Sequence, residues 1–320
     1  MAAARLPLDV FRTLTEATRL STENVEDYVR RAQSIPHWRR LCPWMSIGAK
    51  TPASRQTRRS RSRPANASAQ LRHLRERGYF QIDGALRHAT IDRMRRSIEV
   101  LKRRGWPPVF AFVYDDFWNV WRAPTLVAFI DAALGPGCRL RTRFWSYYVH
   151  ATRGAKGWPP HADGYGTDGL SVWIALSDAT LDNGCMYVVP RDLIGDEVAI
   201  AELAVSESLP VSAFVRLMQS ARPLTASAGT VLGWAFDVIH WGGGSHGGEG
   251  PRISVSAEFV PKGSADDEAS FAGWRTQAPD FRQRLALIAR NLCLFGANDA
   301  WTFKYVDVGR RLLEVLDHTP

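Results

Sequence analysis

The middle of the chain consists of short segments that are rich in aromatic and β-branched residues and are separated by turn residues. These segments are VFAFVY (109–114), LRTRFWSYYVH (140–150), SVWIAL (171–176), MYVVP (186–190), TVLGWAFDVIH (230–240) and RISVSAEFV (252–260). Short strands at this spacing, with few helices between them, are typical of an antiparallel barrel or jelly roll. We therefore expect a mainly β fold for this part of the chain.

Helical patterns flank the predicted strands. Residues 1–50 predict one or two helices, and Pro36 and Pro43 are expected to break the segment that follows them. A further helix should end at Gly78, before a short strand YFQID, and an amphipathic helix should end at Gly105. The tail also predicts helices. The expected organisation is an N-terminal helical extension (1–50), an Arg/Ser-rich flexible loop (51–68) and a β-barrel domain with flanking helices (69–320).

The net charge of +9 raises the question of a nucleic-acid partner. Five of the arginines fall within nine residues of the 51–68 loop, and without them the rest of the chain would carry only +4; they are Arg55, Arg58, Arg59, Arg61 and Arg63. No aromatic residues are interleaved with these charges, as a base-stacking surface would require. We expect a solvated loop and no nucleic-acid partner, with an arm that binds an acidic partner as the alternative.

The chain shows no sign of a membrane or export segment. No apolar run approaches the roughly 20 residues that span a bilayer. The first residues lack the charged-then-apolar layout of a signal peptide. We therefore expect a cytoplasmic protein with no membrane partner.

A histidine and a carboxylate two residues apart, His161 and Asp163, form the first candidate for a metal site. In a strand, residues i and i+2 point to the same face, so both side chains could bind one ion without bending the backbone. Two histidines and one carboxylate on one face of an octahedral ion are the ligands of non-haem iron(II) oxygenases, because this set leaves positions open. The pair alone is weak evidence, since many loops contain one by chance.

A later stretch of the chain supplies residues that would complete such a site. His240 ends a predicted apolar strand, where its side chain could provide the third ligand, and Arg252 opens the next strand. Strand alternation places Arg252, Ser254, Ser256 and Glu258 on one face. An arginine that points into a small barrel needs an anion, and the distal carboxylate of 2-oxoglutarate could form a bidentate pair with it. A surface salt bridge is the alternative for Arg252.

His246 competes with His240 for the role of third ligand. It lies in the glycine-rich sequence HWGGGSHGGEG, where no strand defines its position. It lies only six positions before Arg252, which leaves little room for a turn before that strand begins. We therefore favour His240.

Three stretches carry a resemblance to a known family. They are RERGYFQIDGAL (75–86), PHADG (160–164) with SVWIALSDATLDNGCMYVVP (171–190), and the segment from His240 to Arg252. Together they resemble the phytanoyl-CoA dioxygenase family of iron(II)- and 2-oxoglutarate-dependent oxygenases. The sequence departs from the family's usual pattern after VVP, where it has Arg191, Asp192 and Leu193.

The resemblance implies a double-stranded β-helix with His161, Asp163 and His240 as ligands of Fe(II). It implies that Arg252 binds the carboxylate of 2-oxoglutarate and that Trp173 lines the cosubstrate. Ser254, two residues after the arginine, could add a hydrogen bond. The implied activity is hydroxylation of a small organic molecule with O2, which releases succinate and CO2.

Two alternatives remain open at this stage. The first is an oxygenase or binding protein that acts on a peptide or nucleic acid through the basic loop. The second is a metal-binding barrel without oxygenase activity, or a zinc hydrolase. Zinc accepts two histidines and a carboxylate, but it would not require Arg252 on the inner face of the next strand.

The sequence does not identify the substrate. Asp115, Asp116 and Trp118 could line a pocket, but a capped helix with packed aromatic residues explains them equally well. Of Tyr147 and Tyr148 on one predicted strand, only one can face inward.

Overall fold

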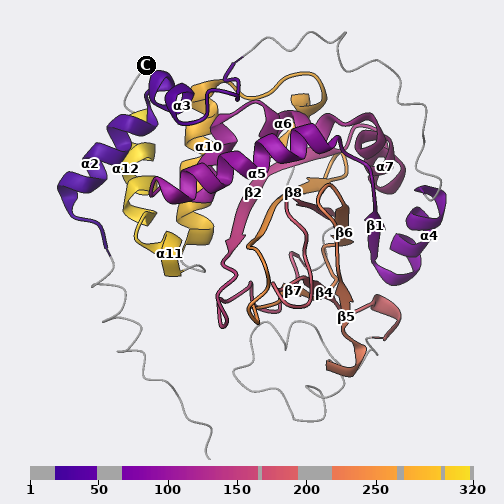
Figure 1. The fold of residues 1–320 in the computed structure, drawn as a ribbon. Helices are drawn as coiled ribbons and strands as arrows, with labels where there is room; N and C mark the ends of the chain where they lie inside the picture. The colour runs from indigo at the N-terminus through magenta and orange to yellow at the C-terminus, as the bar shows by residue number, and fades with distance from the viewer. Residues whose placement is uncertain are drawn as a thin grey trace, which may run out of the picture.

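The structure is a computed structural model that describes residues 19–48, 67–164, 168–193, 218–264, 270–296 and 300–317. Two antiparallel sheets form its centre (Figure 1). The larger sheet has the strand order β1-β6-β3-β8-β2-β9, and the smaller one has the order β5-β4-β7. The strands are β1 (Tyr79–Ile82), β2 (Arg139–Val149), β3 (Leu170–Ala175), β4 (Met186–Val188), β5 (Arg222–Leu224), β6 (Val231–Ala235), β7 (His240–Gly242), β8 (Arg252–Val260) and β9 (Ser270–Phe271).

Strand β8 lies inside the larger sheet, and its two faces contact different parts of the protein. Its apolar side chains belong to a large hydrophobic cluster that includes the helices; they are Ile253, Val255, Ala257 and Phe259. The alternating polar residues, from Arg252 to Glu258, point the other way, toward the smaller sheet. A second hydrophobic cluster lies between the sheets and includes Trp173 from β3 and Met186 from β4. The alternation predicted for this strand is confirmed.

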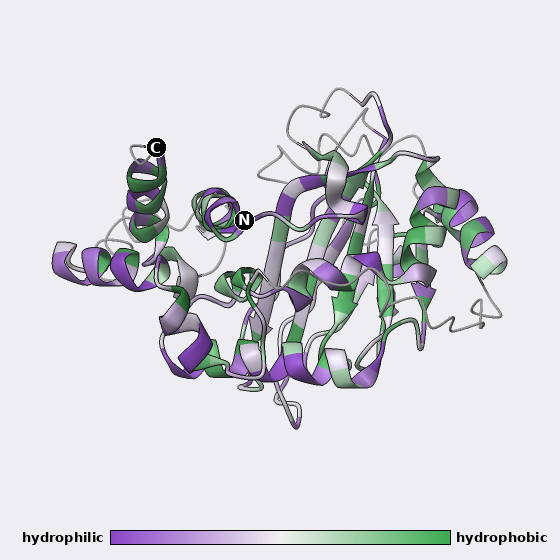
Figure 2. Ribbon diagram, turned by 90° about the horizontal axis from the view of Figure 1, so that it is seen from above, coloured by the Kyte–Doolittle hydropathy of each residue, from purple (hydrophilic) through white to green (hydrophobic). Residues whose placement is uncertain are grey.

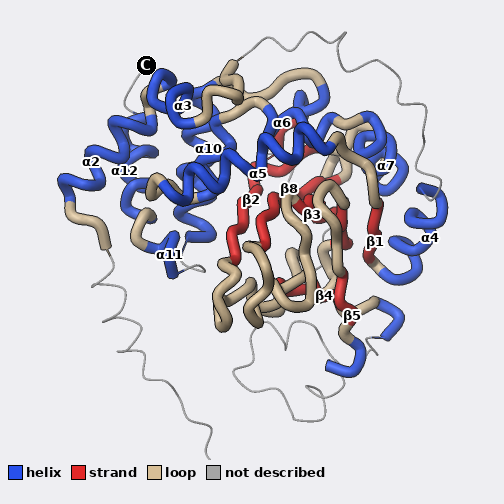
Figure 3. The backbone as a smooth tube through the Cα atoms, in the orientation of Figure 1, coloured by secondary structure: helices blue, strands red, loops and turns tan. Residues whose placement is uncertain are grey.

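Helices cover the outer face of the larger sheet and extend past β2 (Figures 1 and 3). Hydrophobic and hydrophilic residues alternate along them, as expected of helices with one buried face (Figure 2). They are α2 (Thr22–Ala32), α3 (Ile35–Leu41), α4 (Ala67–Arg77), α5 (His88–Arg103), α6 (Asp116–Asn119), α7 (Pro124–Leu134), α10 (Phe281–Phe295), α11 (Ala300–Phe303) and α12 (Val306–Asp317). Short 3-10 helices, η1 (Pro108–Val113), η2 (Val120–Arg122), η3 (Arg191–Leu193) and η5 (Ala272–Arg275), join several of these elements.

The predicted helical extension packs against the rest of the protein in its described part. Ser21 caps α2 by accepting a hydrogen bond from the backbone of Asn24. In α3, Trp38 is fully buried, and its ring stacks on Phe110 with centroids 5.7 Å apart. Residues 1–18 and most of the 51–68 loop lie outside the described residues, so the predicted loop and domain boundaries remain predictions.

Two sequence-based expectations were wrong in the fold, and the expected mainly β class is met only in its antiparallel sheets. VFAFVY is the 3-10 helix η1 and not a strand, because a continuous buried apolar run does not by itself distinguish strand from helix. Pro36 does not interrupt a helix but lies in the first turn of α3. The N–H that proline lacks would have no partner within the helix at this position. Helices also occupy about 45 % of the described residues, more than a mainly β fold implies.

The strand predicted over 230–240 is in fact two strands in two different sheets. Strand β6 ends at Ala235, a turn follows, and His240 begins β7 in the smaller sheet. The short polar residue Asp237 in this segment is the sequence signal for the turn. His240 therefore begins a strand and does not end one.

A buried ion pair connects the helices that cover the larger sheet. Oδ1 of Asp115 lies 2.7 Å from Nη1 of Arg284, and the two side chains are 5 % and 2 % exposed, respectively. Asp115 also accepts a hydrogen bond from the backbone of Gly48, and Arg284 donates to the carbonyl of Val113. Asp115 thus has a structural role, and neither it nor the buried Trp118 lines the cavity between the sheets.

No described helix is long and apolar enough to cross a membrane.

We predict that Asp115→Ala destabilises the protein by about 3–5 kcal/mol, because it leaves the buried Arg284 charge uncompensated. The measurement is urea unfolding followed by circular dichroism. The matched control is Asp116→Ala, which breaks a more exposed pair with Arg93 and should cost about 1 kcal/mol. Equal losses in the two variants would contradict the prediction.

Candidate functional site

Two histidines from distant parts of the chain are joined by a pair of backbone hydrogen bonds. The backbone N–H of His161 donates to the carbonyl of His240 over 3.0 Å, and the backbone N–H of His240 donates to the carbonyl of His161 over 2.9 Å. This isolated antiparallel bridge connects the loop before β3 to the first residue of β7. The two imidazole centroids are consequently 4.2 Å apart.

Backbone carbonyls determine which ring nitrogen of each histidine is available. Nδ1 of His161 lies 2.8 Å from the carbonyl of Pro159, and Nδ1 of His240 lies 3.0 Å from the carbonyl of Val238. A carbonyl can only accept, so we assign the proton to Nδ1 in both rings. Each Nε2 then presents a lone pair, the form in which histidine binds a metal.

Asp163 lies between these two nitrogens. Its Oδ1 is 3.5 Å from Nε2 of His161, and its Oδ2 is 3.6 Å from Nε2 of His240. The hydroxyl of Ser171 and the indole N–H of Trp234 both donate to Oδ2, and these bonds fix the carboxylate. One ligand atom from each of the three residues lies within 4.8 Å of the others, a spacing that could hold one metal ion.

The electrostatics of this cluster suit a cation. Burial raises the pKa of Asp163, but His240, His161 and the Ser171 hydroxyl outweigh burial and hold it below its ordinary value. Burial lowers the pKa of His240 to about 4, so this ring is neutral near pH 7. Burial also lowers the pKa of His161, yet the hydrogen bond and charge of Asp163 outweigh that effect and raise it. A cation bound here would compete with protonation of His161.

Arg252 lies on the same inner face with most of its hydrogen-bonding capacity unused. It is 1 % exposed, and burial lowers its pKa to about 10, so it stays charged at neutral pH. Its Nη1 lies 3.0 Å from the sulfur of Met186, while its Nε and Nη2 have no hydrogen-bond partner. Buried donors without partners cost free energy. A carboxylate ligand would satisfy both of them in the bidentate geometry that guanidinium favours.

The guanidinium of Arg252 lies directly against Gly242. A Cβ at that position would come within 2.8 Å of Nη2 and 3.0 Å of Nη1. Position 242 therefore has to remain glycine for Arg252 to keep this orientation. No sequence pattern distinguishes this glycine from its neighbours.

The other predicted residues differ in how they relate to this site. Trp173 lines the cavity between the sheets, and its indole N–H has no partner. Ser254 is fully buried with an unpartnered hydroxyl, but it does not line the cavity. His246 is exposed and lies outside the candidate metal-ligating cluster, which consists of His161, Asp163 and His240. Tyr147 lines the cavity, whereas Tyr148 packs on the other face beside Lys102.

The candidate metal-ligating cluster and Arg252 line one cavity of about 210 Å³. Sequence reasoning missed several of its lining residues, which are Arg143, Phe144, Trp145, Trp158, Trp234 and Phe295. Strand alternation could have found Trp145, two residues before Tyr147 on β2. Trp158 and Phe295 come from a loop and a helix end, whose positions no local pattern determines.

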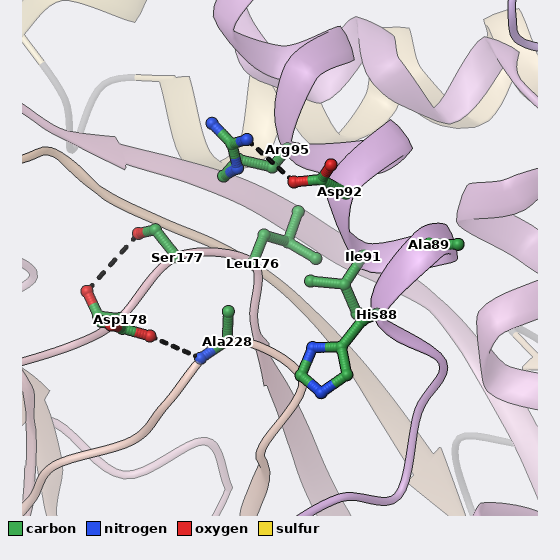
Figure 4. A pocket seen from close by; sticks show the side chains of 9 residues that line it. All are labelled: His88, Ala89, Ile91, Asp92, Arg95, Leu176, Ser177, Asp178 and Ala228. Carbon is green, nitrogen blue, oxygen red and sulfur yellow. Dashed lines mark hydrogen bonds and ion pairs between the residues drawn. The ribbon is translucent and has the colours of Figure 1, made fainter.

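A second hollow, of about 370 Å³, lies between the start of α5 and the segment after β3 (Figure 4). Its charged side chains already have partners, because Asp92 pairs with Arg95 and Asp178 accepts a hydrogen bond from the backbone of Ala228. It contains no member of the metal-ligating cluster.

Comparison with known proteins agrees with this geometry. A sequence model described as phytanoyl-CoA dioxygenase (PhyH) matches residues 74–254, which is more than half of the 320-residue chain. The chain belongs to the phytanoyl-CoA dioxygenase family. The predicted resemblance is thus confirmed. Fe(II) and 2-oxoglutarate, used by this family, are the cofactor and cosubstrate.

Solved structures similar to this member of the phytanoyl-CoA dioxygenase family include other non-haem enzymes. The epimerase SnoN, in complex with Fe3+, alpha ketoglutarate and nogalamycin RO, has 19 % sequence identity and a TM-score of 0.50. The match covers 63 % of this chain and 86 % of SnoN, so the two share a fold. EctD from S. alaskensis is 16 % identical, with a TM-score of 0.45 over 61 % of this chain and 76 % of EctD. No individually curated protein matches the sequence.

We predict that His240→Ala lowers the affinity for Fe(II) or Mn(II) by more than roughly 100-fold, since even outer partners of metal ligands contribute 10- to 100-fold. His246→Ala should leave the affinity unchanged, because this exposed side chain lies away from the cluster. Calorimetric titration under nitrogen measures both. Loss of binding in His246→Ala alone would show that the third ligand is misassigned.

We also predict that Ser171→Ala weakens metal binding by about 10-fold or more, because it removes a hydrogen bond that orients Asp163. Ser177→Ala, a change in a serine that bonds only backbone groups, is the control. Metal affinities measured by the same titration should separate the two variants. If both serine variants bound metal as tightly as the wild type, the orienting role of Ser171 would be refuted.

Proposed function

We propose that the protein is an Fe(II)- and 2-oxoglutarate-dependent dioxygenase that hydroxylates a small organic molecule within a double-stranded β-helix. The observation that carries this proposal is the joint presence, in one cavity, of a His-Asp-His cluster and a buried arginine with unpartnered donors. A metal alone would account for the cluster, and an anionic cosubstrate would account for the arginine.

In this proposal His161, Asp163 and His240 hold Fe(II). The bare Nε2 atoms and the ionised carboxylate form the two-histidine, one-carboxylate set that leaves ligand positions open for cosubstrate and O2. The bound iron and 2-oxoglutarate would supply the activation of O2, with succinate and CO2 as products and one oxygen atom transferred to a C–H bond of the substrate.

Arg252 would bind the distal carboxylate of 2-oxoglutarate through its Nε and Nη2 donors. The open face of Gly242 leaves room for the guanidinium, and Trp173 on β3 contributes a further unpartnered donor to the same cavity. Ser254 is assigned a lesser role, as a hydroxyl on the same face of β8 that lies behind the cavity wall. These residues would orient the cosubstrate, which is the contribution that a protein makes to cofactor chemistry.

Hydroxylation is proposed over other outcomes because a carboxylate occupies position 163. Halogenases that resemble this family carry a small residue at the corresponding position, and this leaves a ligand position for chloride. The similar structure SnoN is an epimerase, so the same cofactor pair also supports reactions without net oxygen insertion. Product analysis with ¹⁸O2 would separate these outcomes.

Two other functions receive less support from the described residues. A zinc hydrolase would use the same three ligands but would leave the buried donors of Arg252 unexplained. A nucleic-acid substrate would require exposed stacking surfaces. In one described groove lined by several arginines, the aromatic residue Trp44 instead has Arg96 over its ring, with the Cζ of Arg96 3.9 Å from the ring centroid.

We predict that anaerobic addition of Fe(II) and then 2-oxoglutarate produces a weak visible charge-transfer band. Arg252→Gln should lower the affinity for 2-oxoglutarate by about 2–5 kcal/mol, or roughly 30-fold and more, as expected when one partner of a buried charged pair is removed. Gly242→Ala should produce a smaller loss, of about tenfold, because it displaces the guanidinium without removing it.

The matched control is Arg191→Gln, since Arg191 pairs with Asp237 on the surface and should not affect the band. A protein that binds iron but develops no band with 2-oxoglutarate would overturn the proposal in favour of another kind of metal site. If Arg252→Gln bound 2-oxoglutarate as tightly as the wild type, the assignment of Arg252 as the residue that binds the cosubstrate would be overturned, but not the rest of the proposal.

A further inference from the structure

We propose that the substrate is an organic acid with a single negative charge and a flat apolar body, and that Arg143 binds its carboxylate. This inference rests on the proposed function and names the substrate class of the same site. Its starting point is the set of charged side chains that line the cavity, which are Arg143, Asp163, Arg252 and Glu258.

Glu258 already has a partner of opposite charge. Its Oε2 lies 2.6 Å from Nη1 of Arg141, and the two side chains are only 15 % and 6 % exposed. Burial of such a pair is tolerated because each charge compensates the other. Glu258 is therefore not free to bind a cationic substrate without giving up this ion pair.

Arg143 has no such partner. It is half-buried, lines the cavity on β2, and lies two residues after Arg141 along the strand. It forms no ion pair with any carboxylate in the described part of the chain. Its charge is close enough to Glu258 to affect the pKa of that carboxyl, but Arg141 makes the direct contact. Among the described residues, the positive charge that Arg143 presents to the cavity is therefore uncompensated.

The charges of the loaded site leave an excess of one positive charge. Fe(II) and the dianion of 2-oxoglutarate cancel, Asp163 and Arg252 cancel, and Glu258 and Arg141 cancel. Arg143 remains. Protonation of Glu258 would only increase the excess. Arg143 is half-buried, so water can still solvate its charge. A molecule that fills the cavity would displace this water, and it should therefore carry one negative charge to replace the lost solvation.

The apolar wall beside Arg143 determines the shape of the substrate body. The ring of Phe295 contacts Trp145 and Trp158, with centroids 5.6 and 6.2 Å away, and Trp158 contacts Tyr147 at 5.6 Å. All four rings line the cavity and together form an aromatic wall. Contiguous rings of this kind favour a flat apolar or aromatic group, which gains both burial and edge or face contacts.

This wall lies on the accessible side of the metal-ligating cluster. The ring centroids of Trp158 and His161 are 6.3 Å apart. The side chain of His161 is 33 % exposed, whereas the side chain of His240 is 4 % exposed. A molecule that enters along the aromatic wall would therefore approach the metal from the His161 side. Arg252 is more deeply buried and remains available for 2-oxoglutarate.

The test compares two probes of the same shape, 3-phenylpropanoate and its neutral amide, 3-phenylpropanamide. Each is titrated calorimetrically under nitrogen into the full-length protein loaded with Mn(II) and 2-oxoglutarate. We expect the acid to bind roughly 10- to 100-fold more tightly than the amide, the size of a charge-assisted hydrogen bond. In Arg143→Gln the acid should bind no better than the amide, while Arg143→Lys should recover part of the difference.

Two further variants make the result specific. Arg72→Gln removes an exposed arginine on α4 and should change neither affinity. Arg252→Gln, titrated at a 2-oxoglutarate concentration raised to offset its weaker binding of the cosubstrate, should keep the preference for the acid, because the carboxylate of the probe binds elsewhere. The proposal is overturned if acid and amide bind equally, if neither binds, or if the preference is lost in Arg252→Gln and kept in Arg143→Gln.

The outcome is separable from that of the proposed function. An acid preference that depends on Arg143, in a protein that forms no charge-transfer band with Fe(II) and 2-oxoglutarate, would retain the anion site and reject the oxygenase. The band without any acid preference would retain the oxygenase and reject this substrate class.

Discussion

Strand β8 has one face in the hydrophobic cluster and the other on the cavity between the sheets, and the arrangement of the whole molecule follows from this constraint. Its apolar side chains pack into the cluster beneath the helices, while Arg252 and Glu258 face the cavity between the sheets. A shift of one residue in its pairing with β2 or β3 would exchange these faces. It would then place charged groups in the hydrophobic cluster at a cost of several kcal/mol each. The position of the buried arginine opposite the metal-ligating cluster is therefore fixed by the same register that forms the core.

Much of the site was predictable because it depends on short-range rules. The two-residue period of β8 placed Arg252 on the inner face. His161 and Asp163 also meet in one cluster, although they lie in the loop before β3 and not in the strand that the i, i+2 argument assumed. The choice of His240 over His246 relied on strand placement, and the structure brings His240 to the cluster although it begins a strand instead of ending one. The pairing that positions it, a bridge to His161 almost 80 residues earlier in the chain, has no local signal.

The features that sequence analysis missed depend on tertiary packing. A continuous apolar run became the 3-10 helix η1, because complete burial on all sides removes the periodicity that distinguishes helix from strand. The aromatic wall combines residues from β2, a loop and the end of α10, which no spacing rule relates to one another. Arg143 also gave no signal in the sequence, where it is one of many arginines. It becomes informative only when the ion pair between Arg141 and Glu258 shows which charge is left over.

The unequal exposure of the two histidines has a kinetic consequence. His240 and Asp163 are held on the inside by backbone and side-chain hydrogen bonds, whereas the ring of His161 borders solvent. An arriving ion would meet His161 first, and a departing ion would lose that ligand last. Exchange of the metal with solution should therefore be limited by rotation of one side chain and by the occupancy of the neighbouring aromatic wall. A molecule bound along that wall would slow the loss of iron from the protein without touching the metal itself.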